Sequence, residues 1–174
     1  MPAIGILGGM GPQASAKLYQ LIIKGTQLYT PTAFDDDYPE IILVNVPAPN
    51  FISNKNNLTK VKKMLIERTK LLEKAGCTIN AIACNTAHIL LPELQSATSV
   101  PFLSIPELVS ERVQTKGFRK VGLLATPITL SSTLFDEALF NVAEIVRPNP
   151  QFANKIEEYI YKQINNCLSK QERK

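Results

Sequence analysis

The chain has 174 residues, of which 45% are apolar and 20% charged, and its 19 Lys and Arg against 15 Asp and Glu give a formal net charge of +4. This composition indicates a soluble globular protein with a sizeable core, folded as one long domain or two small ones. Much of the basic excess lies in two stretches, residues 60–74 and 169–174. Neither contains interleaved aromatic residues, which argues against a nucleic-acid partner.

The first part of the chain alternates apolar runs with stretches of helical spacing. The expected elements, in chain order, are a strand at 3–7, a helix from residue 14, a surface loop at 25–39, a strand at 40–46, a helix from residue 58, a strand at 78–84 and a helix at 86–97. Gly76 is expected to end the helix that begins at residue 58. Pro92 is expected to kink or restart the last helix, because a proline inside a helix removes a hydrogen bond.

A second series begins at "VPFLSI", residues 100–105. After the strand in this run, the expected elements are a helix at 106–116, a strand at 119–125, a helix at 131–143, a strand at 144–147 and a helix at 151–166. Such alternation predicts an α/β fold with parallel strands and helical crossovers, in which ligands bind at the carboxyl ends of the strands.

Residues 3–22 and 120–139 share a plan. Each has an apolar strand containing glycine, a loop with proline, a run of small residues and an amphipathic helix. The plan predicts two pseudo-symmetric parallel-sheet lobes with flanking helices, at 1–98 and 99–174, the second lobe being incomplete. An unpaired sheet edge in that lobe would favour association, with a homodimer as one outcome.

The three cysteines, Cys77, Cys84 and Cys167, are odd in number and lack the spacing of a zinc site. This pattern argues against a disulfide framework and favours a reducing compartment. The N-terminus lacks the basic region of a signal peptide, and no apolar run approaches the ~20 residues that cross a bilayer. We therefore expect a cytoplasmic protein with no membrane partner.

Cys84 lies within "IACNTAH", residues 82–88, where an apolar strand ends and a helix is expected to begin. Free amide groups at a helix start favour the thiolate, which can act as a nucleophile or a base. Asn85 and Thr86 could cap the helix or bind a carboxylate. The alternative is a small buried hydrophobe, since free cysteine is among the most buried residue types.

Two loops after other strands also offer hydrogen-bond donors. "GGMGP" at 8–12 follows the first strand at a position where backbone N–H groups can approach an anion, and "ATPIT" at 125–129 holds the matching place in the second series. Ordinary turn chemistry could account for each loop by itself. The corresponding positions of the loops favour a shared ligand site.

Residues 9–14 also fit G-x-G-x-x-A, the dinucleotide-binding pattern. That pattern expects an acid at the end of the second strand, where Asn45 stands instead, so the match is weak. No phosphate-binding G-x-x-x-x-G-K-[ST] or hydrolase G-x-S-x-G motif is present, and His88 is the only histidine. His88 could bond the Cys84 thiolate or a ligand, or could face solvent.

Three segments together resemble the aspartate/glutamate racemase family, specifically its aspartate racemase branch. They are "GILGGMGPQAS" near the start, "ACNTAH" at 83–88 and "LLATPITLSSTLF" at 123–135. The resemblance extends from residue 3 to about residue 165. It implies two α/β lobes with a site in the cleft between them, and isomerase chemistry that uses neither pyridoxal phosphate (PLP) nor a metal.

The resemblance implies that two cysteines on opposite faces of a substrate amino acid act as base and acid at its α-carbon. Inversion needs a proton removed from one face and delivered to the other. By this resemblance Cys84 is the first catalytic thiol. The residues that it implies as substrate-binding are Gly9, Met10, Asn85, Thr86, Thr126 and Thr129.

The chain departs from the family pattern in three respects. It has no Gly-Cys-Thr-Glu type motif for the second cysteine, and Cys167, in a polar tail, does not match that position. The last strand and closing helices of the second lobe are absent, so the chain is C-terminally truncated relative to the pattern. The segment after the second strand is neutral until Lys55, where aspartate-specific members place a basic side chain.

These observations lead to three hypotheses. The chain is an amino-acid racemase impaired by loss of the second cysteine, a binding protein for a small carboxylate, or a one-cysteine isomerase or decarboxylase. The sequence does not choose between aspartate, glutamate and another amino acid or dicarboxylate as ligand.

Overall fold

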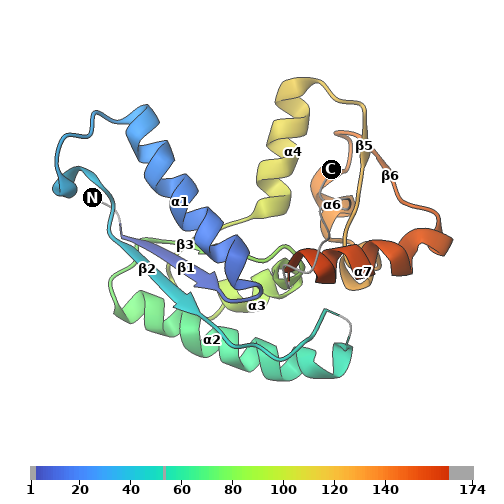
Figure 1. Cartoon of the computed structure of the whole chain (residues 1–174), viewed down its shortest axis with the longest axis horizontal. Helices are drawn as coiled ribbons and strands as arrows, with labels where there is room; N and C mark the ends of the chain where they lie inside the picture. The colour runs from blue at the N-terminus through green and yellow to red at the C-terminus, as the bar shows by residue number, and fades with distance from the viewer. Residues whose placement is uncertain (1–2, 53, 165–174) are drawn as a thin grey trace. The chain divides into compact units, whose positions relative to one another are not determined.

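The computed structural model describes residues 3–52 and 54–164. The chain divides into two compact units, Met1–Ser104 and Ile105–Lys174, which are coloured blue to green and yellow to red in Figure 1. Among the described helices, none combines the length and apolar character needed to cross a membrane.

The first unit is built on a four-stranded parallel sheet with the strand order β2-β1-β3-β4. The strands are β1 (Ile4–Gly8), β2 (Ile41–Asn45), β3 (Ile79–Ile82) and β4 (Phe102–Leu103). The main helices are α1 (Pro12–Tyr29), α2 (Leu58–Lys74) and α3 (Leu91–Gln95), and short 3-10 helices occupy Asp35–Asp37, Lys55–Asn57 and Thr86–Leu90. Figure 1 shows α1 on one face of the sheet and α2 on the other. This layering confirms the predicted α/β class.

The core of the first unit lies where β1 meets α2. Leu7 of β1 is fully buried in one cluster with Val61, Leu65 and Leu72 on the inner face of α2, and Ile6 is fully buried on the other face of the sheet. A central strand covered on both faces is apolar along its length rather than alternating, which is the pattern seen in "AIGIL". Burial of these side chains holds β1 rigidly, so its carboxyl end is a firm base for a site.

Helix α1 is longer than the sequence suggested. We expected a surface loop from Gly25, but the helix continues to Tyr29, and only the part after it forms a loop with one 3-10 turn at Asp35–Asp37. A glycine inside a helix costs roughly 1 kcal/mol relative to alanine, which flanking turns can offset. The two helix-end predictions near Gly76 and Pro92 are confirmed: Gly76 has φ +85° just after α2, and Pro92 starts the new helix α3 in its first turn.

The strand at 102–103 belongs to the first sheet. We expected it to open the second lobe, after a boundary at residue 98, but Phe102 and Leu103 pair with Asn80 and Ala81 of β3. The division between the two units falls after Ser104. A two-residue strand has too few side chains for its sequence to show which sheet it joins.

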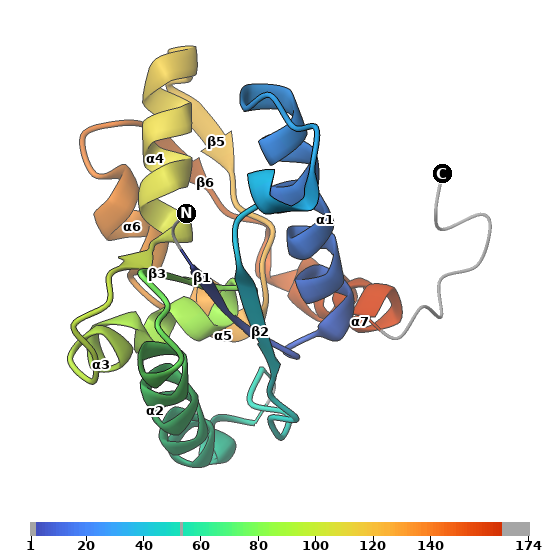
Figure 2. The same ribbon diagram turned by 90° about the vertical axis from the view of Figure 1, so that its left-hand side faces the viewer.

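The second unit contains a two-stranded parallel sheet of β5 (Lys120–Gly122) and β6 (Glu144–Val146). Its helices are α4 (Ile105–Lys116), α5 (Pro127–Leu130), α6 (Leu134–Leu139) and α7 (Ala153–Ile164). Figure 2 shows β5 and β6 side by side from a second direction. The last two residues of the helix expected at 151–166 lie outside the described residues.

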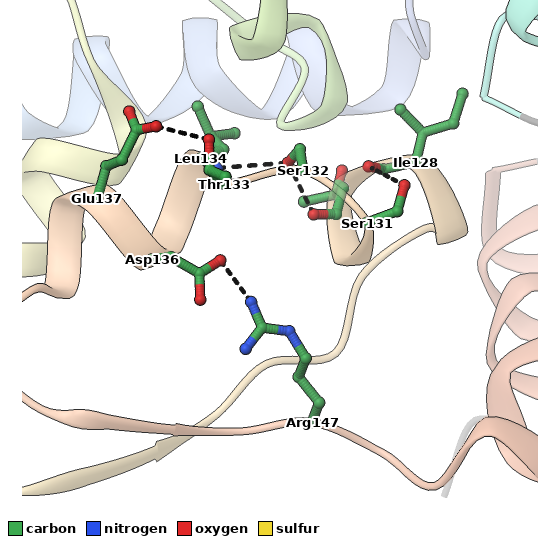
Figure 3. A network of polar contacts seen from close by, with 9 residues as sticks. Ile128, Ser131, Ser132, Thr133, Leu134, Asp136, Glu137 and Arg147 are labelled. Atoms are coloured by element: carbon green, nitrogen blue, oxygen red, sulfur yellow. Dashed lines mark hydrogen bonds and ion pairs between the residues drawn. The ribbon is translucent and has the colours of Figure 1, made fainter.

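The helix expected at 131–143 is observed only as the shorter α6, Leu134–Leu139, and the loop expected before it contains the extra short helix α5, Pro127–Leu130; "SST" separates the two. Figure 3 shows the hydrogen bonds that the hydroxyls of this segment make. Ser131 donates to the Ile128 carbonyl at 3.1 Å, Ser132 donates to the Thr129 carbonyl at 2.8 Å, and Thr133 donates to the Glu137 carboxylate at 2.6 Å. Serine and threonine compete in this way with regular helix bonding, so the helix breaks here.

Candidate active site at the carboxyl edge of the first sheet

The candidate site of the first unit begins where two neighbouring strands end. Strand β1 ends at Gly8 and β3 ends at Ile82, and the two strands pair in parallel. The Ala83 amide still donates to the Leu7 carbonyl at 2.9 Å. The loop starting at Gly9 and the turn starting at Cys84 therefore leave the same edge of the sheet, as the sequence predicted.

The glycine loop is held close to β2. Gly9 has φ +90°, and a Cβ built there would lie 2.5 Å from the Val46 nitrogen and 2.6 Å from the Val46 oxygen. Only glycine accepts both the backbone angle and this contact without strain. Met10, the next residue, is buried in the same core cluster as Cys84.

Ser15 holds the loop from the first turns of α1. The Gly9 amide donates to its hydroxyl oxygen at 2.9 Å, and the hydroxyl donates to the Gly11 carbonyl at 3.3 Å. Ser15 is 2% exposed. In the sequence, Ser15 stands only as one of a run of small residues. The signal that could have identified it was its position six residues after a strained glycine.

Cys84 follows β3 and begins the 3-10 helix Thr86–Leu90. Its side chain is buried, and its sulfur accepts hydrogen bonds from the backbone N–H groups of Ala87 and Thr86. Backbone amides therefore bond the thiol, as we expected. They belong to a short 3-10 helix and not to the predicted long α-helix. The thiol has donors that would stabilise a negative charge.

The pKa of Cys84 nevertheless departs from the expected direction. Burial raises the pKa of the thiol above its ordinary value of 9.0, and the opposing effect of the Ala87 and Thr86 amides is smaller. The prediction that the surroundings make this thiol acidic is thus wrong for the chain without a ligand, because desolvation disfavours the charged form more than two amides favour it. A raised pKa makes the thiolate scarcer at pH 7 and, once formed, a stronger base.

Asn85 supplies an unused acceptor beside the thiol. Within the part of the chain that the structure describes, its Oδ1 atom is buried and accepts no hydrogen bond, and its side chain does not cap the 3-10 helix. A buried carbonyl oxygen without a donor costs free energy. A ligand N–H group would satisfy it. Thr86, the other residue expected to bind substrate, is 3% exposed.

His88 lies beneath the turn, with no exposed surface. Its Nδ1 atom is 2.9 Å from the carbonyl oxygen of Cys84. Burial lowers the pKa of His88 below 6.5, against the smaller raising effect of the backbone groups of Cys84, Asn85 and Leu103. The histidine is therefore neutral at pH 7 and bonds the backbone of the turn, which settles the choice between bonding and facing solvent.

The two expected residues of the second unit lie together in that unit. Thr126 caps α5 by accepting from the Thr129 amide at 3.4 Å, and the two hydroxyl oxygens are 3.1 Å apart. Both residues are buried. A buried hydroxyl pair at the start of a short helix holds the "ATPIT" loop in a single conformation.

A separate cavity of about 510 Å³ lies elsewhere in the first unit. It is lined by Tyr19, Ile23, Asp35, Tyr38, Pro39 and Ile41. Ile41 is the first residue of β2, so this cavity is at the amino edge of the sheet and contains none of the expected site residues.

The other thiols do not join the candidate site in the described region. Cys77 precedes β3 at the amino edge of the sheet, where burial and the Glu40 carboxylate raise its pKa. Cys167 lies outside the described residues. Residues 3–52 and 54–164 also contain no group of three His, Cys, Asp or Glu side chains placed to hold a metal ion.

The sequence of the chain is similar to that of known racemases. The chain is 32% identical over 136 residues to the broad specificity amino-acid racemase RacX of Bacillus subtilis, an alignment that covers 78% of this chain and 60% of that protein. The chain thus spans less than two thirds of the length of this curated relative.

Solved structures agree with the sequence match. An aspartate racemase homologue from Pyrococcus horikoshii superposes with a TM-score of 0.76 at 28% identity, covering 93% of this chain and 71% of that one. The aspartate racemase of Picrophilus torridus superposes with a TM-score of 0.74 at 27% identity, covering 95% and 69%. The sequence pattern of the Asp/Glu/Hydantoin racemase family matches residues 7–172. The chain therefore belongs to the Asp/Glu/hydantoin racemase family.

Proposed function

We propose that this chain acts on an amino acid as a PLP-independent isomerase of the racemase type, with Cys84 as the base at the α-carbon. The observation that carries the proposal is the setting of the Cys84 sulfur. It lies at the carboxyl edge of a parallel sheet and accepts two backbone N–H groups, and the next residue in the chain, Asn85, has a buried Oδ1 atom without a donor in the described structure. Family membership supports the same chemistry.

The proposed step is a proton transfer. The Cys84 thiolate takes the α-hydrogen, so the Cα–H bond breaks, an S–H bond forms, and the electron pair moves into the adjacent carboxylate. Return of a proton to the same face restores the starting enantiomer, whereas return to the opposite face inverts it. Inversion therefore needs a second acid beyond Cys84.

Because the pKa of Cys84 is raised, we propose that the bound substrate stabilises the thiolate. An opposite charge within ~4–6 Å favours the charged form of a group. The α-ammonium of an amino acid supplies such a charge, and one of its N–H groups can donate to Asn85 Oδ1, which lacks a donor in the described structure. On this proposal the substrate itself ionises the thiol.

The same proposal assigns the remaining contacts. Gly9 and Met10 line the site from the glycine loop, and Thr86 binds the substrate beside Asn85. The role of Thr126 and Thr129 in binding a carboxylate stays a prediction. No second thiol of the family's Gly-Cys-Thr-Glu type stands in the 174 residues. We therefore propose that α-hydrogen exchange by this chain is faster than inversion.

Exchange of the α-hydrogen in D₂O tests the proposal. Each enantiomer of aspartate and glutamate is incubated with the chain, loss of the α-proton signal is followed by NMR, and chirality is measured on the same samples. We expect exchange that outpaces inversion for at least one amino acid, and no exchange for succinate, which lacks the ammonium group. Equal rates of exchange and inversion would point to a full two-base racemase.

Two other results would contradict the proposal. Binding of an amino acid without exchange would identify a carboxylate-binding protein. Loss of carbon dioxide from a dicarboxylate would identify a one-cysteine decarboxylase. Calorimetric titration with the same ligands separates binding without exchange from no binding at all.

A further inference from the structure

We infer that His88 is a positioning residue for Cys84: its Nδ1–H group holds the Cys84 carbonyl and so keeps the backbone amides of Thr86 and Ala87 directed at the sulfur. The inference rests on the proposed function only in taking Cys84 as the reacting thiol. The contacts that carry it are present without any ligand.

The first step concerns the position of the proton on the ring. Nδ1 lies 2.9 Å from the Cys84 carbonyl oxygen, and a carbonyl oxygen only accepts hydrogen bonds. The ring is fully buried, which favours its neutral form. A neutral imidazole has a single N–H group, and we assign it to Nδ1 because the Cys84 carbonyl has the largest effect of the three backbone groups that favour a ring proton.

The second step concerns the turn itself. The backbone amide of His88 donates to the Asn85 carbonyl at 3.1 Å, while its side chain bonds the Cys84 carbonyl. One residue thus binds the two consecutive carbonyls that begin the turn. Thr86 and Ala87, whose amides bond the sulfur, lie between these two anchors. Releasing the side-chain anchor frees Cys84 to rotate away from the amides.

The third step concerns the sheet. The backbone of Leu103 in β4 also interacts with the imidazole. β4 pairs with β3, the strand that leads to Cys84. The ring therefore lies between the turn after β3 and the neighbouring strand, on the buried side of the thiol turn.

A purely structural histidine would also be buried and bonded, so the test must separate packing from aiming. The amide nitrogen of asparagine can take the place of Nδ1, whereas that of glutamine reaches the position of Nε2. H88N keeps the donor to Cys84, and H88Q loses it while preserving more of the side-chain volume. If His88 only fills space, H88Q should change the pKa of the Cys84 thiol less than H88N does. If His88 positions the turn, H88N should change that pKa less than H88Q does.

The main readout is ionisation of the Cys84 thiol, measured without substrate. In a C77S/C167S background Cys84 is the only thiol, because the chain has three cysteines. The Cβ signal of [3-¹³C]cysteine is followed by NMR against pH in this background and in its H88N and H88Q derivatives. We expect H88Q to raise the midpoint by about one pH unit, equal to about a tenfold loss of thiolate at a given pH, and H88N to leave it within about 0.3 unit.

A second measurement needs no variant. His88 is the only histidine of the chain, so the ¹⁵N spectrum of histidine-labelled protein at pH 7 contains one imidazole. We expect its Nδ1 to carry the proton and its Nε2 to be unprotonated. The opposite tautomer, or equal midpoints for Cys84 in H88N and H88Q, would overturn the inference.

The assay of α-hydrogen exchange separates this inference from the proposed function. If the parent chain exchanges no amino acid, the proposed function fails while the thiol titration still tests His88. If the parent chain exchanges the α-hydrogen and H88Q lowers kcat for exchange about tenfold with little change in KM, the proposed function and the role of His88 are both supported.

Discussion

The hydroxyl of Ser15 in α1 accepts a hydrogen bond from the Gly9 amide at 2.9 Å, so the start of the helix is bonded directly to the loop that leaves β1. The same hydroxyl donates to the Gly11 carbonyl at 3.3 Å. The loop is thereby held from its far side, while Val46 of the chain after β2 packs against Gly9. A loop braced in this way presents Met10 in one position beside the buried cluster that contains Cys84.

Ser15→Ala should therefore destabilise the first unit. The change leaves the Gly9 amide without an acceptor in a buried place, which costs about 1–3 kcal/mol. Urea denaturation followed by circular dichroism measures the loss. Ser96→Ala is a suitable control, because Ser96 also donates to a backbone carbonyl but is exposed, and its loss should stay within about 0.5 kcal/mol. Equal effects of the two changes would contradict the bracing role of Ser15.

Gly9→Ala should be more damaging than a typical glycine replacement. The residue would be held at φ +90°, a conformation that costs about 1–3 kcal/mol for a side chain, and its Cβ would overlap the Val46 backbone. The free energy of unfolding should fall by more than that strain alone. Gly25→Ala is the matched control: a Cβ there meets nothing within 4 Å, and the position is inside α1. We expect Gly25→Ala to stabilise by about 0.5–1 kcal/mol.

Because the pKa of buried His88 is lowered, we expect the protein to lose stability in mild acid. Its folded pKa lies below the value of 6.5 that it has when unfolded, so the unfolded chain takes up the proton first. Stability is complete above pH 6.5 and falls as the pH drops toward the folded pKa, by at most about 1.4 kcal/mol per pH unit. Urea midpoints between pH 7.5 and 5 should show this slope in the parent chain and lose it in H88N. Parallel curves for the two proteins would argue against a buried neutral imidazole.

Because the pKa values of the buried thiols are raised, we also expect a loss of stability at alkaline pH. Burial raises the pKa of Cys84 and Cys77 above 9.0, so the unfolded chain releases these protons first. Stability from both groups is complete below pH 9.0 and falls as the pH rises toward their folded pKa values. The double variant C77A/C84A should show a smaller decline between pH 8.5 and 10.5 than the parent. A decline of the same size would mean that neither thiol is buried in solution.

Much of the architecture follows from local patterns in the sequence. The apolar runs at 3–7, 40–46 and 78–84 each coincide with an observed strand to within about one residue at the carboxyl end of the first, and Gly76 and Pro92 act as helix signals in the places expected. These features depend on few residues that are close in sequence, which is why pattern alone reveals them. Family motifs around Gly9 and Cys84 then predict a site at the ends of the strands that precede them.

The errors come from interactions between distant residues. β4 joins the first sheet because of its pairing with Asn80 and Ala81, about twenty residues earlier. The pKa direction of Cys84 depends on how many neighbouring groups exclude water, a property of the folded core that a run of seven letters does not contain. The break between α5 and α6 could in principle be predicted, since "SST" contains two serines whose hydroxyls bond backbone carbonyls there.

The central claim is that Cys84 is the base at the α-carbon, and the most direct measurement compares α-hydrogen exchange by C84A and C77A under identical conditions in D₂O. Both changes remove one buried thiol of similar size from the first unit, so unfolding affects them alike. We expect C77A to exchange the α-hydrogen within about threefold of the parent, and C84A to exchange at least about a hundredfold more slowly, in the range of a lost general base. Exchange by folded C84A at the parent rate would contradict the claim.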